Sequence, residues 1–393
     1  MCGIIGIQNN SEAAMLAYMG LYAQQHRGQE GAGVVSSDGV NLHRHMGQGL
    51  VSDVFSDSDV FDGLHGDSAI GHVRYSTTGN SDKKNVGPLT FNMGDQYLSI
   101  AHNGNLVNIE DVRLELRDEG ALFQTSTDTE LIIHLIAREK GNNLIERVEK
   151  ALQRIEGAYS LLLLSPDKII AARDPHGIRP FCMGKLNDTI VFASETCALD
   201  LLGAEYIRDV QPGEMIVAND DGYYSKTIME PQKSKHCIFE YIYFSRPDSK
   251  IFGKSVDKMR REFGRQLAQE NSSDTGDIVI SVPDSSNTCA LGFSAESDIK
   301  HEIGLIRNHY VGRTFIFPSQ RLRDISVRLK FNTVKGVVKD KAVIIIDDSI
   351  VRGTTLKKLA KLIRESGAKK VHVRISSPPV RFPCCFGMDF PTV

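Results

Sequence analysis

The chain lacks the features that mark secreted, membrane-spanning and nucleic-acid-binding proteins. No apolar run approaches the roughly 20 residues that a membrane span needs. The N-terminal sequence MCGIIGIQNN has no basic segment followed by a long hydrophobic core, so we expect no secretory signal. A net charge of −3 provides no general attraction for nucleic acid or for an anionic membrane. We therefore expect neither as a partner.

The chain also lacks a disulfide framework, because its seven cysteines are scattered and odd in number. This pattern favours a reducing compartment, for which the cytoplasm is the default, with cysteines serving as nucleophile, metal ligand or core residue. The proportions of 41% hydrophobic and 24% charged residues are typical of a globular protein. Because 393 residues exceed the usual size of one domain, the length predicts two.

The most informative stretch is KAVIIIDDSIVRGTT, at Lys341–Thr355. Its β-branched run Val343–Ile346 is typical of a strand buried on both faces of a parallel sheet. The strand ends in Asp347 and Asp348, and a loop of small and hydroxyl-bearing residues leads to a helix with an apolar stripe from Leu356. This order predicts a nest of backbone N–H groups suited to a phosphate, beside carboxylates that can face ribose hydroxyls or Mg²⁺. The alternative is an ordinary strand-to-helix turn with a capping aspartate.

The whole string resembles the phosphoribosyl-pyrophosphate (PRPP) motif of type I phosphoribosyltransferases. The resemblance implies a parallel α/β domain in which Asp347 and Asp348 orient the ribose hydroxyls and contact Mg²⁺ directly or through water. It also implies that the loop backbone binds the 5-phosphate. The PRPP-binding residues that it implies in this loop are Ser349, Val351, Arg352, Gly353, Thr354 and Thr355.

Two segments upstream extend the same resemblance. The stretch GDIVISVPDSSNTCALGF, from residue 276, predicts a buried strand, a loop and a helix. Its PDSS loop is implied to handle the pyrophosphate of PRPP, with Ser285 as a Mg²⁺ ligand; a serine helix cap is the alternative. The cationic tract 308–332, which contains Arg313, predicts a loop that closes over a polyanion, or else a solvated basic loop. A last strand near residue 371 completes a parallel sheet with strands near 277 and 343.

At the other end of the chain, Cys2 directly follows the initiator methionine. A small second residue favours removal of the methionine, which would give Cys2 a free α-amino group. An α-amine with a reference pKa of about 7.7–8.0 is a suitable base for a thiol. The isoleucines and glycines of the following CGIIGI predict a short buried strand that presents Cys2 at its end. Taken alone, a cysteine at position 2 predicts no function.

Four further stretches place polar groups among glycines and small residues, as close-approach binding loops need. They are HRGQEGAGV at 26–34, GHVRYSTTG at 71–79, AHNGNLVN at 101–108 and STDTELI at 126–132. Together with CGIIGI they resemble the glutaminase domain of N-terminal-nucleophile amidotransferases. The resemblance implies a four-layer αββα fold, with two stacked antiparallel sheets between helices.

The resemblance also implies how glutamine would be hydrolysed. Cys2 would attack the side-chain amide carbon, release ammonia and leave a thioester for water to hydrolyse. The Asn103 side chain and the Gly104 backbone N–H would form the oxyanion hole, where loss of one donor typically costs about 10²–10³ in rate. The alternative for Asn103-Gly104 is a plain hairpin turn.

Four more residues would hold glutamine in place. Arg74 would pair with the substrate α-carboxylate, to which a guanidinium can bind in bidentate fashion. Asp128 would accept the α-ammonium group, and Arg27 with Gly28 would belong to a loop that closes over the substrate. The alternatives are a surface ion pair for Arg74 and a helix cap for Asp128.

Both halves in this order resemble the amidophosphoribosyltransferase family. We place the boundary at the polar connector PQKSK, which gives a glutaminase domain at 2–232 and a phosphoribosyltransferase domain at 236–393. The resemblance implies that glutamine, PRPP and water give 5-phosphoribosylamine, glutamate and pyrophosphate, the committed step of purine synthesis. It further implies internal transfer of ammonia, dependence on magnesium, and a homotetramer inhibited by purine nucleotides.

One branch of this family carries an iron–sulfur cluster on four cysteines. Cys237 and Cys384 match the first two ligand positions, whereas the later C-x-x-C pair is absent and Cys385 adds a neighbouring thiol. Either the chain is a fragment that lacks C-terminal helices and two cluster ligands, or the cluster is absent. We favour the fragment.

Three other functions stay open at this point. The glutaminase half could serve a different acceptor, such as a sugar phosphate or aspartate, although the DDSIVRGTT string argues against it. A PRPP-sensing regulator would have no reason to carry an N-terminal cysteine glutaminase. An inactive fragment with the right domains is the third alternative.

Overall fold

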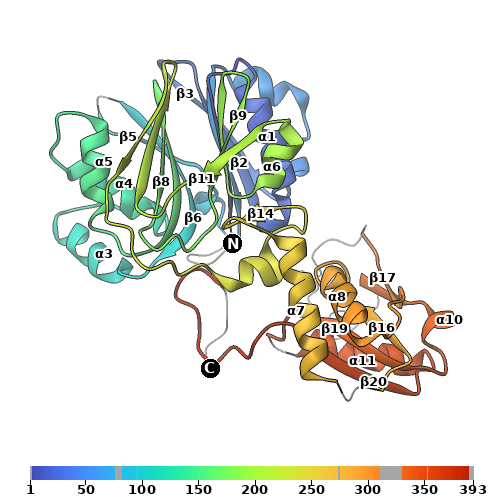
Figure 1. Ribbon diagram of the computed structural model, residues 1–393. Coiled ribbons are helices and arrows are strands. Elements are labelled where there is room, and N and C mark those ends of the chain that lie inside the picture. The colour runs from blue at the N-terminus through green and yellow to red at the C-terminus, as the bar shows by residue number, and fades with distance from the viewer. Residues whose placement is uncertain are drawn as a thin grey trace. The chain divides into compact units, whose positions relative to one another are not determined.

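The computed structural model describes residues 2–75, 82–94, 96–272, 275–309, 330–351 and 353–388. The chain forms two compact units (Figure 1). The first unit comprises Met1–Glu240, Phe244–Gly253 and Phe382–Val393, and the second comprises Tyr241–Tyr243 and Lys254–Arg381. Among the described residues, no helix has both the length and the apolar character needed to cross a membrane.

Two antiparallel sheets form the centre of the first unit. The first sheet contains, in spatial order, β11 (Glu205–Asp209), β9 (Cys182–Leu186), β10 (Thr189–Ala193), β1 (Gly3–Gln8), β4 (Ser68–Arg74), β2 (Gly31–Ser37) and β3 (Leu42–Gln48). The second contains β13 (Gly222–Thr227), β12 (Glu214–Asn219), β8 (Lys168–Arg173), β7 (Gly157–Ser165), β6 (Tyr97–Leu106) and β5 (Leu89–Asn92). Strand β1 therefore lies in the middle of its sheet, paired with β10 and β4.

Helices cover the outer face of each sheet, as Figure 1 shows. The helices of this unit are α1 (Ala13–Ala23), α2 (Val51–Val54), α3 (Ile109–Asp118), α4 (Thr129–Arg138), α5 (Leu144–Leu152) and α6 (Thr196–Leu202). Short 3-10 turns occupy η1 (Gln25–Arg27), η2 (Ser58–Gly63) and η3 (Lys83–Asn85). The π-helix η4 spans Glu240–Phe244, and its residues Tyr241–Tyr243 belong to the second unit.

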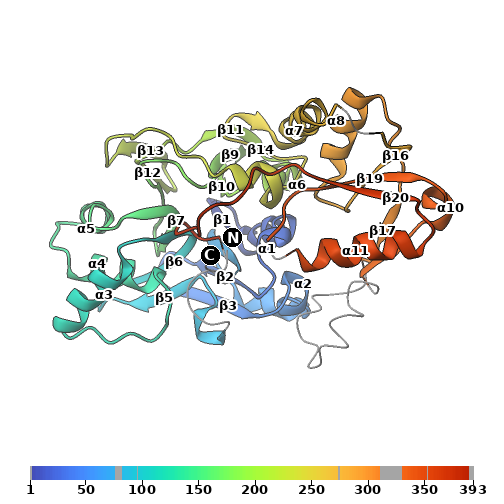
Figure 2. The same cartoon turned by 90° about the horizontal axis from the view of Figure 1, so that it is seen from below.

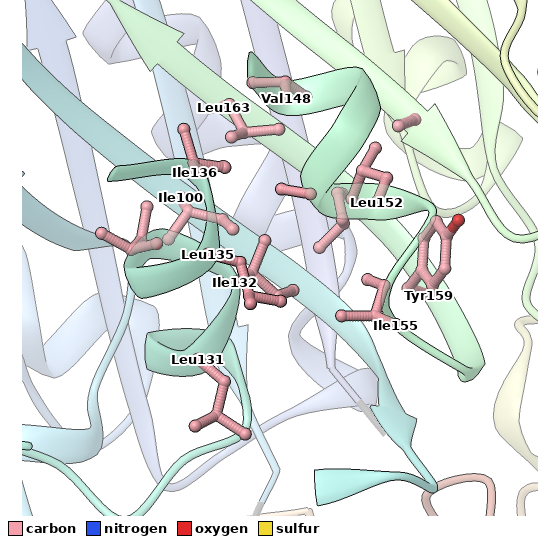
Figure 3. Close-up of a cluster of buried hydrophobic side chains, with 14 of the residues drawn as sticks. Ile100, Leu131, Ile132, Leu135, Ile136, Val148, Leu152, Ile155, Tyr159 and Leu163 are labelled. Atoms are coloured by element: carbon pink, nitrogen blue, oxygen red, sulfur yellow. The ribbon is translucent and has the colours of Figure 1, made fainter. Parts of the chain in front are cut away.

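Three hydrophobic clusters fill the three spaces between these layers. One joins α1 and α6 to the first sheet, through residues such as Leu21 and Leu199. A second lies between the two sheets, where Ile4 of β1 meets Leu162 of β7. The third joins α4 and α5 to the second sheet, and Figure 3 shows Leu135 within it. Three cores imply four layers, so the structure has the αββα arrangement expected from the sequence.

A parallel sheet in the order β16 (Ile278–Ser281), β19 (Ala342–Asp347) and β20 (Lys370–Ile375) forms the core of the second unit. These are the three strands predicted near residues 277, 343 and 371. Alternate residues of β19 enter two different clusters: Ile345 packs with Ile363, and Ile346 packs with Phe293. Strand β19 is therefore buried on both faces, as its unbroken β-branched sequence predicts.

Helices pack on this sheet, and Figure 2 shows α11 beside it. The remaining elements of the second unit are α7 (Val256–Glu270), α8 (Asn287–Ser297), α10 (Lys335–Val338), α11 (Thr354–Glu365), β15 (Lys254–Ser255), β17 (Leu305–Arg307) and β18 (Phe331–Thr333). Strand β14 (Lys250–Ile251) belongs to the first unit.

We expect the cluster between the two sheets to contribute strongly to the stability of the first unit. Leu162→Ala would empty a fully buried site in it and should lower the free energy of unfolding by about 2–5 kcal/mol. Leu122→Ala is the control, because Leu122 is 85% exposed and should change stability by less than about 0.5 kcal/mol. Urea unfolding followed by circular dichroism measures both. Equal effects of the two substitutions would contradict this description of the core.

Candidate functional site

A pocket in the first unit surrounds Cys2. The thiol lies just before β1 and is buried, and it shares the pocket with residues from the ends of β4 and β6 and from the start of α4. The lining residues are Cys2, His72, Arg74, Tyr75, Asn85, Gly87, Leu89, Ile100, His102, Gly104, Thr127, Asp128 and Thr129. The structure thus brings four of the predicted residues, Cys2, Arg74, Gly104 and Asp128, to one place.

The thiol of Cys2 is in an environment that favours the thiolate. Its Sγ donates to the Tyr75 carbonyl oxygen at 3.6 Å. Burial alone would raise the pKa of this thiol, but the neighbouring His72 imidazole outweighs burial and lowers the pKa to about 6. A thiol with this pKa is largely ionised at neutral pH and is a ready nucleophile.

Asn103 and Gly28, also predicted as site residues, lie next to residues that line the pocket. Asn103 precedes Gly104 in β6 and is fully buried, and within the described part of the chain its side-chain oxygen and nitrogen have no hydrogen-bond partner. A buried amide without partners is costly unless a ligand supplies them. Gly28 approaches the backbone of Arg74 so closely that an added Cβ would lie 2.6 Å from it.

Arg27 does not line this pocket. Its side chain is buried against two carboxylates, those of Glu195 and Glu240, and its Nε donates to the Cys2 carbonyl oxygen at 2.9 Å. Its predicted role in covering glutamine stays a prediction.

Two histidines of the pocket were missed by the sequence analysis. His72 belongs to β4 and stands two residues before Arg74, so both side chains face the same side of the strand. His102 stands two residues before Gly104 in β6, and its Nδ1 lies 3.6 Å from Oδ1 of Asp128. The period of two in the sequences HVR and HNG was the signal that could have found them.

Asp128 and His102 form a buried contact between a carboxylate and an imidazole. Burial opposes both charges, but each group favours the charged form of the other, so the pKa of His102 is raised and that of Asp128 is lowered. The backbone N–H of Leu106 also donates to Asp128 Oδ2 at 3.0 Å. The predicted contact between Asp128 and a substrate ammonium group stays a prediction.

In the second unit, the acidic pair stands at the carboxyl end of β19. Ser285 donates to Oδ2 of Asp348, and the Ser286 hydroxyl donates to Oδ1 of Asp347 at 3.3 Å. The predicted residues Ser285, Asp347 and Asp348 are therefore together. Such a site at the carboxyl ends of parallel strands is where open α/β sheets bind ligands.

The electrostatics of this pair fit a divalent cation. Burial, followed by repulsion from Asp348, raises the pKa of Asp347 to about 7, and burial also raises the pKa of Asp348. A positive charge beside the pair would offset both effects. Among the described residues, no three His, Cys, Asp or Glu side chains form a metal-binding group. Two carboxylates nevertheless suit Mg²⁺, which is commonly held by one or two carboxylates together with substrate phosphates.

The loop after the acidic pair leads to the N-terminus of α11, which no described side chain caps. Gly353, at the cap position of α11, has a φ of 67°, a left-handed conformation that favours glycine. The first turn of this helix carries no acidic residue, and Thr354 and Thr355 are exposed. The first backbone N–H groups of a helix have no partner within the helix and can bind a phosphate.

Ser349 and Val351 belong to the described part of this loop, and Ser349 donates to Oδ1 of Asp348. The predicted residues Arg313 and Arg352 lie outside the described residues.

The two predicted cluster ligands, Cys237 and Cys384, are free thiols in the first unit. Burial raises the pKa of the Cys237 thiol, and nearby Cys384 adds to the rise. A four-iron cluster takes four thiolates. The described residues contain no metal-binding group of even three His, Cys, Asp or Glu side chains, so by themselves they do not fit this cluster.

A family model matches part of the chain, and known proteins align with all of it. A family model described as a glutamine amidotransferase domain matches residues 72–201. The chain is 51% identical over 394 residues to amidophosphoribosyltransferase 2, chloroplastic, of Arabidopsis thaliana. The alignment covers 100% of this chain and 70% of the relative. It is 47% identical over 392 residues to the amidophosphoribosyltransferase of Bacillus subtilis (strain 168), covering 100% of this chain and 82% of the relative.

A solved structure agrees with these relatives. The glutamine phosphoribosylpyrophosphate amidotransferase from B. subtilis, complexed with ADP and GMP, matches with a TM-score of 0.94 and 47% identity. The match covers 100% of this chain and 85% of that one. It confirms the predicted fold class.

The low pKa of Cys2 can be tested by alkylation. The rate of reaction with iodoacetamide should be half-maximal near pH 6, because the thiolate is the reactive form. His72→Asn should move this midpoint upward, since it removes the group that most favours the thiolate. His43→Asn is the control, because His43 does not line the pocket. An unchanged midpoint in His72→Asn would contradict the electrostatic role of His72.

The repulsion within the acidic pair can be tested by thermal unfolding. The pKa of Asp347 is raised from 3.8 to about 7 in the folded state, so ionisation of this carboxyl destabilises the fold. The destabilisation is small at pH 4, where the folded carboxyl is protonated, and complete at pH 8, where it is ionised. Asp347→Asn should therefore raise the Tm at pH 8 by several degrees and leave it little changed at pH 4. Glu296→Gln, an exposed control in the same unit, should have no such pH dependence. A lower Tm for Asp347→Asn at pH 8 would contradict the repulsion.

Proposed function

This chain belongs to the amidophosphoribosyltransferase family, and we propose that it transfers the amide nitrogen of glutamine to PRPP. The products are 5-phosphoribosylamine, glutamate and pyrophosphate, in the first committed step of purine synthesis. The observation that carries this proposal is the presence in one chain of a buried thiol with a low pKa and of an acidic pair at the end of a parallel strand. The first suits amide hydrolysis, and the second suits a sugar pyrophosphate.

In the first unit, the Cys2 thiolate attacks the side-chain amide carbon of glutamine. The C–N bond then breaks, the nitrogen takes the former thiol proton back from the Cys2 α-amino group and leaves as ammonia, and a thioester remains. Water hydrolyses the thioester to glutamate and restores the thiol. The α-amino group of Cys2, free after removal of the methionine, is the base, and His72 supports the thiolate.

Donors near the thiol stabilise the oxyanion of the tetrahedral intermediate. The Asn103 amide group is buried and has no partner among the described residues, so it is available to a developing oxyanion. The backbone N–H of Gly104 is the second donor. Arg74 binds the glutamine α-carboxylate and Asp128 the α-ammonium group, while Arg27 and Gly28 stay candidates for the loop that covers glutamine.

In the second unit, ammonia attacks the anomeric carbon of PRPP as pyrophosphate leaves. Asp347 and Asp348 orient the ribose 2- and 3-hydroxyls and stabilise positive charge that develops on the sugar. The backbone from Ser349 to Thr355 binds the 5-phosphate at the N-terminus of α11. Ser285, Asp347 and Asp348 would hold Mg²⁺ together with the substrate, and the ion would supply positive charge to the leaving pyrophosphate. Arg313 and Arg352 are proposed as further PRPP contacts.

Transfer of ammonia within the protein explains why both activities belong to one chain. Ammonium is not nucleophilic, so release into water at neutral pH would waste most of the product of the first reaction. Family membership over the whole length of the chain favours PRPP over the acceptors of other amidotransferases, and over a regulatory role.

Regulation, assembly, location and the cluster belong to the same proposal. Because the B. subtilis structure holds ADP and GMP, we expect purine nucleotides to inhibit this enzyme. We also propose a homotetramer, and a cytoplasmic location consistent with seven free cysteines. An iron–sulfur cluster on Cys237 and Cys384 would need two ligands from beyond the described residues.

Because the two reactions are assigned to different units, we expect Cys2→Ala to lose glutamine hydrolysis selectively. Glutamine-dependent synthesis and glutamate release should vanish, because no thiolate remains to attack the amide. Synthesis from added ammonia should persist, since it needs only the second unit. PRPP should stimulate glutamate release by the unmodified protein. Glutamate release that survives in Cys2→Ala would overturn the role of Cys2.

A further inference from the structure

Arg27 lies at the centre of a buried ionic network beside the nucleophile. It ends η1 and is 1% exposed. Its Nη1 and Nη2 atoms each donate to a Glu240 carboxylate oxygen at 3.0 Å, and Nη1 also donates to Glu195. On its other edge, Nε donates to the carbonyl oxygen of Cys2 at 2.9 Å. The guanidinium thus joins the backbone of Cys2 to two carboxylates.

The two carboxylates are themselves fixed. Glu195 is fully buried and also accepts hydrogen bonds from His26 Nε2 at 2.8 Å, the Arg246 backbone N–H at 2.9 Å and Ser249 Oγ at 2.7 Å. Its pKa is held well below the usual range because the charges of His26 and Arg27 outweigh burial.

Glu240 is held in the same way. It is fully buried, accepts from Ser245 Oγ at 3.0 Å, and lies 3.4 Å from Arg179 Nη1. Burial opposes the positive charge of Arg27, but the carboxylates of Glu240 and Glu195 outweigh burial and raise the pKa of the guanidinium. Arg27 therefore remains a cation at all accessible pH values. A planar guanidinium between two fixed carboxylates has little freedom to move.

These contacts leave Arg27 poorly placed to bind a substrate. Both edges of its guanidinium are engaged within the protein, and its side chain does not line the pocket around Cys2. Among the described residues, the contact that Arg27 makes toward the site is with the backbone carbonyl group of Cys2. We propose that Arg27 is a positioning residue for Cys2, held by Glu195 and Glu240, rather than a ligand for glutamine. This inference rests on the proposed role of Cys2 in amide hydrolysis.

The physical basis is that nucleophilic attack tolerates little misplacement of the reacting atoms. A shift of about 1 Å in a reacting group can cost about 10²-fold in rate. Cys2 directly precedes β1, whose register with β4 begins at Gly3, so the bond from Arg27 to the Cys2 carbonyl group limits how far the thiol can move. The same bond keeps the thiol beside His72, whose imidazole lowers the pKa of Cys2.

The test uses Arg27→Lys in the full chain. Removal of the charge altogether would take from two buried carboxylates the cation that they share, which is destabilising. Lysine keeps the charge but cannot bind both carboxylates and the Cys2 carbonyl group in one plane. We expect kcat for glutamine hydrolysis to fall about 10- to 100-fold while the KM for glutamine changes less than about twofold. The midpoint pH of Cys2 alkylation, measured without glutamine, should rise.

Arg74→Lys is the matched control, because it makes the same change at an arginine that lines the pocket. It should raise the KM for glutamine and leave the alkylation midpoint in place. Ammonia-dependent synthesis reports whether each variant is folded. If Arg27→Lys loses that activity, Glu240→Gln replaces it in the test, and a fall in kcat at constant KM supports the proposal.

The opposite pattern would overturn it. A raised KM with an unchanged kcat and alkylation profile, in Arg27→Lys or in Glu240→Gln if that replaces it, would make Arg27 a glutamine ligand. Failure of the proposed function is a separate result, since it would appear as glutamate release that persists in Cys2→Ala.

Discussion

The function proposed for the first unit depends on the position of the Cys2 thiol, which lies at the end of a strand that is buried along its whole length. Strand β1 lies in the middle of a seven-stranded sheet, and all six of its residues are buried. Its register with β4 pairs Ile4 with His72, which places the imidazole near the residue that precedes the strand. The position of the thiol is therefore set by the sheet, by the core between the sheets and by the contact of Arg27 with the Cys2 carbonyl group.

Both sites contain groups that are poorly satisfied in the free protein. The Asn103 amide is buried without a partner among the described residues, and Asp347 and Asp348 repel each other in a largely buried position. Each arrangement lowers stability and each would be relieved by a substrate: an oxyanion for the amide, and a sugar pyrophosphate with its cation for the carboxylates. Departures from good local packing and pairing are expected where a protein functions.

Much of this arrangement could be predicted from the sequence. The unbroken β-branched run before Asp347 indicated a strand buried on both faces, and the structure confirms β19 as the middle strand of a parallel sheet. The motifs around Cys2, Arg74, Gly104 and Asp128 indicated residues that one pocket brings together. Local patterns were sufficient here, because each motif contains the residue that reaches the site.

The rest depends on contacts between distant parts of the chain. Arg27 meets Glu195 and Glu240, which are 168 and 213 residues away, and no spacing rule relates them. The pairing of His102 with Asp128 and the effect of His72 on Cys2 likewise follow from the stacking of strands and not from any motif. The network around Arg27 therefore could not be predicted from the sequence, because no local pattern indicates which distant residues contact one another.

We propose that ammonia released by Cys2 reaches the sugar without entering the solvent. This transfer is tested most directly by supplying glutamine labelled with ¹⁵N in its amide group, together with PRPP and an excess of unlabelled ammonium. Our account predicts that the phosphoribosylamine formed carries mainly ¹⁵N, as measured by mass spectrometry. Product labelled only in proportion to the mixed pool of free ammonia would contradict it.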